Sequence, residues 1–231
     1  MYGRSHMKRS KATYSICAIT AVCCAVMAIV DAVIQPVYAV KSAVKVLLFL
    51  ICPLAYGYFA KNCSLKSIFR AKKSSVLFSL LLCIPVYAVI TGGYFLLKDV
   101  FDFSNITTSL TGNIGVSKEN FVFVAIYISF ANSLLEEFFF RGFAFLSLKN
   151  HADRAFAHAF SAGMFAVYHI AMMTGWFSVW LYAIIIAGLF AGGIIFNLLN
   201  ERTECIYTSW FVHMAANFAI NTVGFILFGI I

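Results

Sequence analysis

WFSVWLYAIIIAGLFAGGIIFNLL, residues 176–199, runs for 24 residues without an Asp, Glu, Lys or Arg. An α-helix rises about 1.5 Å per residue, so about 20 apolar residues are enough to cross the hydrocarbon core of a bilayer. This stretch therefore predicts a membrane-spanning helix. Six further apolar stretches predict further spans, at 13–35, 43–60, 74–97, 119–147, 154–174 and 205–230.

The composition agrees with a membrane protein. Of 231 residues, 62% are hydrophobic and 11% are charged, whereas about a quarter of a soluble domain is charged. The apolar runs are continuous rather than alternating, which excludes a membrane β-barrel. We expect an all-α, polytopic helical membrane protein with about seven transmembrane helices (seven or eight) around a polar intramembrane cavity. Residues 1–7, MYGRSHM, resemble an expression-vector remnant, which leaves 8–231 as a single integral membrane domain.

The basic residues lie mainly in the short segments between the apolar runs. The N-terminal segment and the connections near 61–73, 148–154 and 200–204 contain twelve Lys and Arg residues. The other side contains about four, which are Lys41, Lys45, Lys98 and Lys118. By the positive-inside rule, the N-terminus should be cytoplasmic and the C-terminus outside, in what we expect to be a bacterial plasma membrane. Membrane orientation accounts for the net charge of +8, so we expect no nucleic acid partner.

Three charges interrupt the fourth apolar stretch, in LLEEFFFRGF at residues 134–143. Each charge at mid-bilayer costs roughly 2.5–3.5 kcal/mol on the insertion scale. Glu137 and Arg141 are four residues apart and can pair on one helix face. Glu136 lies about 100° around the helix and needs another partner. A hydrogen bond to Asn132 would be its simplest structural role, and a group on another span would be a functional one.

Two other stretches carry polar side chains one helical turn apart. FAVYH contains Phe165 and His169, and HMAAN contains His213 and Asn217. Measured from the expected cytoplasmic ends of the spans, Glu136 lies about 18 Å deep, the two imidazoles about 23 Å and 12 Å, and the amide about 18 Å. We therefore expect four polar groups from three helices to meet at one level.

These groups suit the hydrolysis of an amide. A carboxylate and an imidazole can hold and deprotonate a water, while a second imidazole and an amide can donate hydrogen bonds to an oxyanion. Two His and one Glu also resemble a hydrolytic zinc ligand set, and the residues alone leave that alternative open. The seven cysteines contain no CxxC pair, so we expect no cysteine-based metal site.

The ordered set of motifs resembles a known family. EExxxR at Glu136–Arg141, FxxxH at Phe165–His169 and HxxxN at His213–Asn217 are similar to the three motifs of the CAAX protease and bacteriocin-processing (CPBP, or Abi) membrane protease family. The resemblance covers a motif-bearing core at 119–231, and the first three spans match only as membrane helices. We count seven spans, whereas close relatives of the CAAX enzyme are described with eight.

The resemblance implies a role for each matching residue. Glu136 and His169 would activate the attacking water, and His213 and Asn217 would stabilise the oxyanion. The residues that would shape the site are Glu137, Arg141 and Phe165. The prenyl-protein members resemble glutamate-dependent enzymes without metal, so no metal ligand is assigned, and zinc stays an open alternative.

The function implied is that of a membrane-embedded endopeptidase. Its partners would be membrane lipids and a hydrophobic or lipidated peptide, bound in extended form because a helix hides its amides from attack. One alternative is a non-proteolytic bacteriocin-immunity or scaffold membrane protein. Another is a proton-coupled transporter, which would also retain buried ionisable groups but should show broken helices or internal symmetry.

Overall fold

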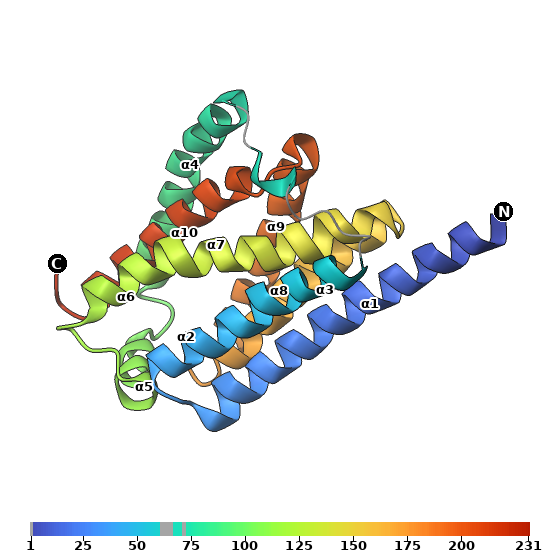
Figure 1. Ribbon diagram of the computed structural model, residues 1–231. Coiled ribbons are helices and arrows are strands. Elements are labelled where there is room, and N and C mark those ends of the chain that lie inside the picture. The colour runs from blue at the N-terminus through green and yellow to red at the C-terminus, as the bar shows by residue number, and fades with distance from the viewer. Residues whose placement is uncertain (1, 61–66, 71–72) are drawn as a thin grey trace.

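The computed structural model describes residues 2–60, 67–70 and 73–231 of the chain. These residues form helices and no strand (Figure 1). Seven of the helices in this part of the chain are long and apolar enough to cross a membrane. The expected fold class, a polytopic helical membrane protein with seven spans, is confirmed.

The candidate spans lie within a few residues of the predicted ones. Their bounds are Lys11–Ile34, Tyr38–Ala60, Lys73–Leu97, Phe121–Asn150, Arg154–Met172, Val179–Thr203 and Tyr207–Leu227. We refer to them as the first to the seventh span. The largest difference from the predicted bounds is at the second span, which begins five residues earlier than the predicted start at 43.

Several spans combine α-helix with other helical turns. The first span consists of α1 (Tyr2–Ile29) from Lys11 onward and a π-helical turn, Val30–Ile34. The second contains α2 (Tyr38–Val46) and α3 (Cys52–Ala60), joined by a π-helical turn at Leu47–Ile51. In the fourth, α6 (Phe121–Tyr127) and α7 (Ser133–Glu136) alternate with π-helical segments at Ile128–Asn132 and Glu137–Ser147, before a final turn at Leu148–Asn150. The remaining helices are α4 (Lys73–Leu97), α5 (Ser104–Ile114), α8 (Arg154–Met172), α9 (Val179–Thr203) and α10 (Tyr207–Leu227).

Local sequence signals explain two of the helix boundaries. The first span ends at Gln35, which has a left-handed φ of 45° and precedes Pro36. Asp153 caps α8, since its carboxylate accepts hydrogen bonds from the backbone N–H groups of Ala155 at 2.9 Å and Phe156 at 3.1 Å. A helix end leaves backbone groups without partners. Asp153 accepts hydrogen bonds from two such N–H groups, and Pro36 has no N–H that would need a partner.

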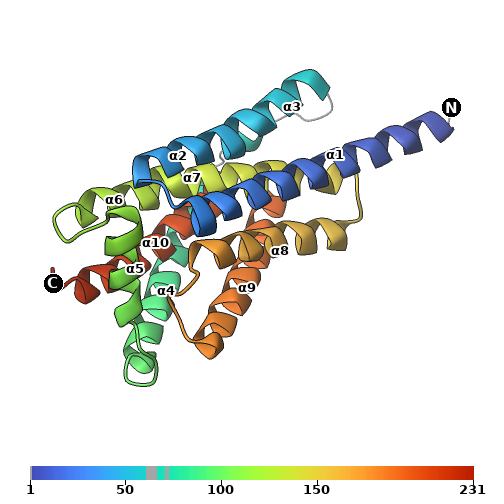
Figure 2. The same ribbon diagram turned by 90° about the horizontal axis from the view of Figure 1, so that it is seen from below.

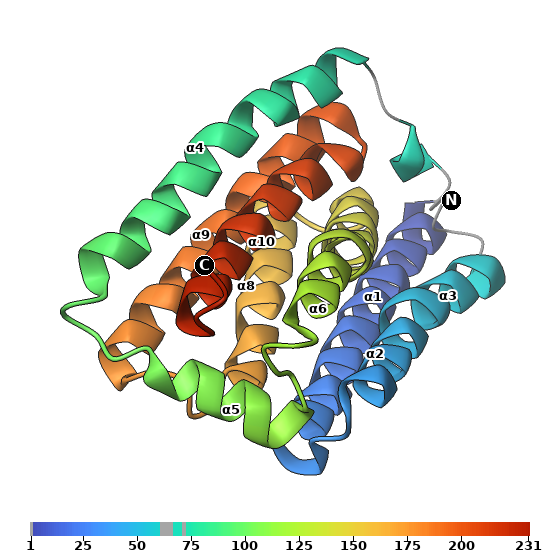
Figure 3. The ribbon, with the colours of Figure 1, turned by 90° about the vertical axis from the view of Figure 1, so that its left-hand side faces the viewer.

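The fourth span occupies the centre of the bundle. Figure 3 shows α6 between α1 and α2 on one side and α8 and α10 on the other. Helix α4 lies at the periphery and packs on α10, and α8 packs on α9. Figure 2 shows α2 and α3 running beside α1, and α5 lies across one end of the bundle in Figure 3. The central position surrounds the charges of the fourth span with protein rather than lipid.

Aromatic side chains of the fourth span form much of the core. Phe139 stacks on Phe49 of the second span, with ring centroids 4.0 Å apart and an interplanar angle of 3°. Phe140 meets Phe165 edge to face at 5.3 Å. In contrast, apolar side chains of the peripheral helices face outward, as Leu96 in α4 does at 80% exposure. This distribution fits a bundle whose outer surface contacts lipid.

Candidate active site

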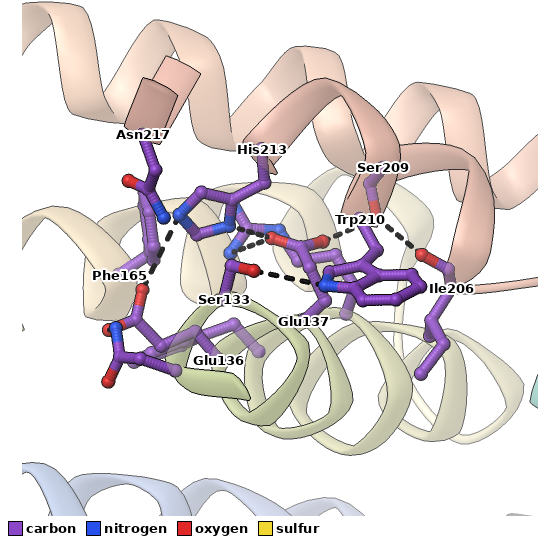
Figure 4. Close-up of polar contacts among 12 residues, drawn as sticks. Ser133, Glu136, Glu137, Phe165, Ile206, Ser209, Trp210, His213 and Asn217 are labelled. Carbon is purple, nitrogen blue, oxygen red and sulfur yellow. Dashed lines mark hydrogen bonds and ion pairs between the residues drawn. The ribbon is translucent and has the colours of Figure 1, made fainter. Parts of the chain in front are cut away.

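Glu136, at the end of α7, is buried among groups from three other helices. Its Oε1 accepts hydrogen bonds from the ammonium of Lys45 and from Nδ2 of Asn132, the latter at 3.0 Å. Its Oε2 lies 3.6 Å from Nε2 of His213 (Figure 4). One carboxylate oxygen is therefore held by donors, while the other faces an imidazole.

Lys45 is the main correction to the sequence analysis, which counted it among the external basic residues. It is 4% exposed inside the second span, and its ammonium also donates to Oδ1 of Asn132 at 2.6 Å. The span begins at Tyr38, so Lys45 lies about 10 Å along it. Pairing with Glu136 offsets the cost of burying either charge alone. Lys41, one turn earlier, pairs instead with Asp31 at 2.5 Å.

Glu137 forms a second carboxylate centre beside the first. Its Oε1 accepts a hydrogen bond from Nδ1 of His213 at 2.8 Å and lies 3.5 Å from Nη1 of Arg141. Its Oε2 accepts a hydrogen bond from the hydroxyl of Ser209 (Figure 4). That hydroxyl in turn accepts a hydrogen bond from Nδ2 of Asn200 at 2.6 Å. The expected ion pair with Arg141 is present. The sequence analysis missed Ser209 and Asn200, although Ser209 lies one turn before His213 on the same helix face.

Arg141 is fully buried and stacks on aromatic rings. Its guanidinium carbon lies 4.1 Å from the ring centroid of Phe165 and 5.0 Å from that of Phe196. None of its side-chain nitrogens has a hydrogen-bond partner among the described residues. The ion pair with Glu137 and these cation–π contacts therefore hold the guanidinium. Through its ring, Phe165 forms part of the wall of the site.

His169 contributes a second imidazole from α8. Its Nδ1 lies 2.7 Å from the backbone carbonyl oxygen of Phe165. Because a carbonyl oxygen can only accept, Nδ1 carries the proton in the neutral ring and Nε2 carries a lone pair. The imidazole is close enough to Glu136 and His213 to interact with both electrostatically. The structure thus brings Glu136, His169 and His213 together.

Asn217 is near this cluster, and one of its amide hydrogens is in use. Its Nδ2 donates to the carbonyl oxygen of Ile128 at 3.1 Å. Asn221 and Trp210 also donate to the fourth span, to Ala125 and Phe130, so polar bonds join α10 to that span along its length. The amide of Asn217 has a second N–H besides the one bound to Ile128.

The charges of the site balance. Glu136 and Glu137 are matched by Lys45 and Arg141, and each cation lies beside one carboxylate. Balanced pairing explains how four ionisable groups can be kept inside a membrane-spanning bundle. Among the described residues, no group of three or more His, Cys, Asp and Glu side chains is placed to hold a metal ion. The ammonium of Lys45 occupies the position beside Oε1 of Glu136.

Comparison with protein families agrees with these motifs. The family model described as Type II CAAX prenyl endopeptidase Rce1-like matches residues 118–219. That segment runs from the start of the fourth span into α10 and holds every site residue predicted from the sequence, but it does not include Lys45. Comparison with curated proteins and with solved structures gives no match. Residues 118–219, somewhat less than half of the chain, are therefore similar to the Rce1-like type II CAAX prenyl endopeptidases.

Proposed function

We propose that this protein hydrolyses a peptide bond in a hydrophobic or lipidated peptide with a water activated by Glu136 and His169. The observation that carries the proposal is the convergence of Glu136, His169 and His213 inside the bundle, on helices that are remote in sequence. The match to the family of CAAX prenyl endopeptidases supports the same activity.

The two activating groups are arranged as acceptors. Oε2 of Glu136 is turned away from Lys45 and Asn132, and Nε2 of His169 carries a lone pair. A water between them can donate one hydrogen bond to each, which increases the nucleophilicity of its oxygen. When this oxygen attacks the peptide carbonyl, Glu136 takes the proton. It then gives the proton to the leaving amine as the C–N bond breaks, and the products are an amine and a carboxylic acid, which loses its remaining proton to water.

The groups opposite can stabilise the oxyanion. Nδ1–H of His213 donates to Glu137, as the imidazole does to the carboxylate in a serine protease triad, and this contact fixes the orientation of the ring. When Nε2 of His213 also carries a proton, it can donate to the developing oxyanion. The second N–H of Asn217 is the other candidate donor. Ser209 and Arg141 would hold Glu137 in place.

The position of the site supports a hydrophobic or lipidated peptide as the substrate. A membrane-embedded site can receive a lipid-modified peptide from the bilayer, and the matched family is described as prenyl endopeptidases. The peptide would bind in extended form, since its amides must be exposed to attack. The positive-inside rule orients the bundle with its N-terminus in the cytoplasm.

A cleavage assay with purified full-length protein tests the proposal. The probe is a farnesylated peptide that ends in a CAAX sequence and carries a quenched fluorophore. Glu136→Gln preserves the shape of the side chain and removes the base, so kcat should fall by roughly 10²–10⁴-fold. The matched control is Glu201→Gln, which alters a carboxylate paired with Arg154 and His158 away from the site and should retain activity.

Two results would contradict proteolysis. One is full cleavage by folded Glu136→Gln protein. The other is a pair of observations: purified wild-type protein cleaves no peptide, and cells that carry Glu136→Gln keep the full biological effect. This pair would favour a scaffold or immunity protein. Solute movement into proteoliposomes without cleavage favours a transporter. Mass spectrometry of membrane peptides from cells with wild-type or Glu136→Gln protein would identify the substrate.

A further inference from the structure

Lys45 is the one site group that comes from outside the matched segment. It lies in α2, its ammonium contacts Glu136 and Asn132, and its neighbours Val46 and Leu47 are exposed on the outer surface of the bundle. The ammonium also lies 4.9 Å from the ring centroid of Tyr168. A lysine directed inward from an otherwise lipid-facing helix suggests a function for its charge.

We propose that Lys45 is a positioning residue of the active site, which keeps Glu136 ionised and directs its free oxygen, Oε2, towards the attacking water. This inference rests on the proposed function. It means that the motif-bearing segment does not form a complete site by itself, because the second span supplies the cation that the carboxylate requires.

Hydrogen bonds to one oxygen of Glu136 fix the orientation of its carboxylate. Lys45 and Asn132 both donate to Oε1 of Glu136, and Lys45 also bonds to Asn132, which closes a ring of three polar groups. With Oε1 held, rotation of the carboxylate is restricted and Oε2 remains directed at His213. A base held in one orientation can meet the water in reactive geometry.

The charge balance of the site also depends on Lys45. If Lys45 were neutral, the site would hold two carboxylates and only the guanidinium of Arg141, which lies beside Glu137. Glu136 would then be a buried carboxylate without a paired cation, and burial would favour its neutral, protonated form. A protonated carboxyl cannot accept a proton from water. The other ionisable side chains that interact electrostatically with Glu136 are Cys24, Tyr38, Arg141, Tyr168, His169 and His213.

A purely structural role is the competing explanation, in which Lys45 only ties the second span to the fourth. The two roles differ in what a folded variant does. A structural tie alone would leave turnover unchanged in protein that remains folded. A positioning role predicts a fall in kcat at nearly constant KM, together with a change in the protonation of Glu136.

The experiment compares wild-type protein with Lys45→Met and Lys45→Arg, using the farnesylated fluorogenic peptide and full-length protein in lipid nanodiscs. We expect kcat of Lys45→Met to fall on the order of a hundredfold with KM little changed, and Lys45→Arg, which keeps the charge, to recover part of the loss. The matched control is Lys41→Gln combined with Asp31→Asn, which removes the neighbouring ion pair as a unit and should leave kcat nearly unchanged.

A second readout does not require activity. Infrared difference spectroscopy of Lys45→Met should show the carbonyl band of a protonated carboxylic acid. The band should be absent from wild-type protein and should disappear when Glu136→Gln is added. If Lys45→Met does not fold, Lys45→Gln replaces it with the same expectations, since its amide can still donate to Glu136 but carries no charge.

The outcomes separate the two proposals. Folded Lys45→Met or Lys45→Gln with wild-type kcat and no carboxylic acid band would overturn the role of Lys45 and leave the proposed peptidase standing. Wild-type protein that cleaves no peptide would overturn the peptidase, and the infrared band alone would then decide whether Lys45 keeps Glu136 ionised.

Discussion

The coupling between Glu137 and Arg141 should be far stronger than that of the exposed ion pair between Arg154 and Glu201. The Nη1 and Oε1 atoms are 3.5 Å apart and both side chains are fully buried. At an effective dielectric constant of about 20, two unit charges at this distance attract each other by about 5 kcal/mol. Replacing Arg141 with Met leaves a buried carboxylate without its cation, which typically costs about 3–5 kcal/mol.

A double-mutant cycle measures the pair itself. The variants are Arg141→Met, Glu137→Gln and the combination of the two, and the quantity is the free energy of unfolding in mixed detergent micelles. We expect each single change to be destabilising and the double change to recover part of the loss, because it leaves no unpaired charge. The expected coupling energy is about 3 kcal/mol or more.

The control is a second ion pair with a shorter distance but more solvent. Arg154 Nε lies 2.7 Å from Oε1 of Glu201, and the side chain of Arg154 is 68% exposed. Water screens that pair, so its coupling should be much smaller and should weaken with salt. If the cycle at Arg154 and Glu201 gives a coupling as large as that at Glu137 and Arg141, burial does not set the strength of the pair and the reasoning is wrong.

Three further predictions concern other parts of the structure. Ser209→Ala removes the hydroxyl that donates to Glu137, and it should lower kcat for the farnesylated probe by about tenfold without loss of fold. An unchanged kcat would show that Ser209 does not support Glu137 in catalysis. Gly193→Ala should destabilise the bundle by about 1–3 kcal/mol, because the added Cβ would lie 3.0 Å from the Cα of Ala162. Gly192→Ala is the control: its Cβ would have no atom within 4 Å, so it should be neutral in the same unfolding assay. A backbone hydrogen bond from the start of α5 lowers the pKa of Asp102. The stabilisation of α5 by this carboxylate should therefore be fully present above the unfolded-state pKa of about 3.9 and be lost as the pH falls through the lower folded-state pKa. Hydrogen exchange at α5 should show this acid dependence in wild-type protein and not in Asp102→Asn.

The spans were predictable because the transfer of a helix into lipid depends mainly on its own composition. The span predicted at 176–199 is Val179–Thr203 in the structure, and the one predicted at 154–174 is Arg154–Met172. Each prediction needed only local residues. The second span was placed too late because Lys41 resembled the charged flank of a helix rather than part of it.

The meeting of the motif residues was also predictable in part. Residue spacing and depth indicated that Glu136, His169 and His213 lie at one level, and the structure brings them together. The ion pair between Glu137 and Arg141 followed from helical spacing alone. The roles of these residues in hydrolysis remain proposals that the variants above can test.

By itself, the sequence determined that seven stretches are long and apolar enough to cross a membrane, and that the charges at 134–143 must have partners inside the bundle. Only the tertiary structure decided that Lys45, 91 residues before Glu136, is the partner of that carboxylate, and that Ser209 and Asn200 support Glu137. The physical reason is that apolar partition acts residue by residue along the chain, whereas partner choice depends on how separate helices pack and in which register. Lys41 and Lys45 lie on the same face of one helix, and only the position of the fourth span against that helix determines which ammonium meets Glu136.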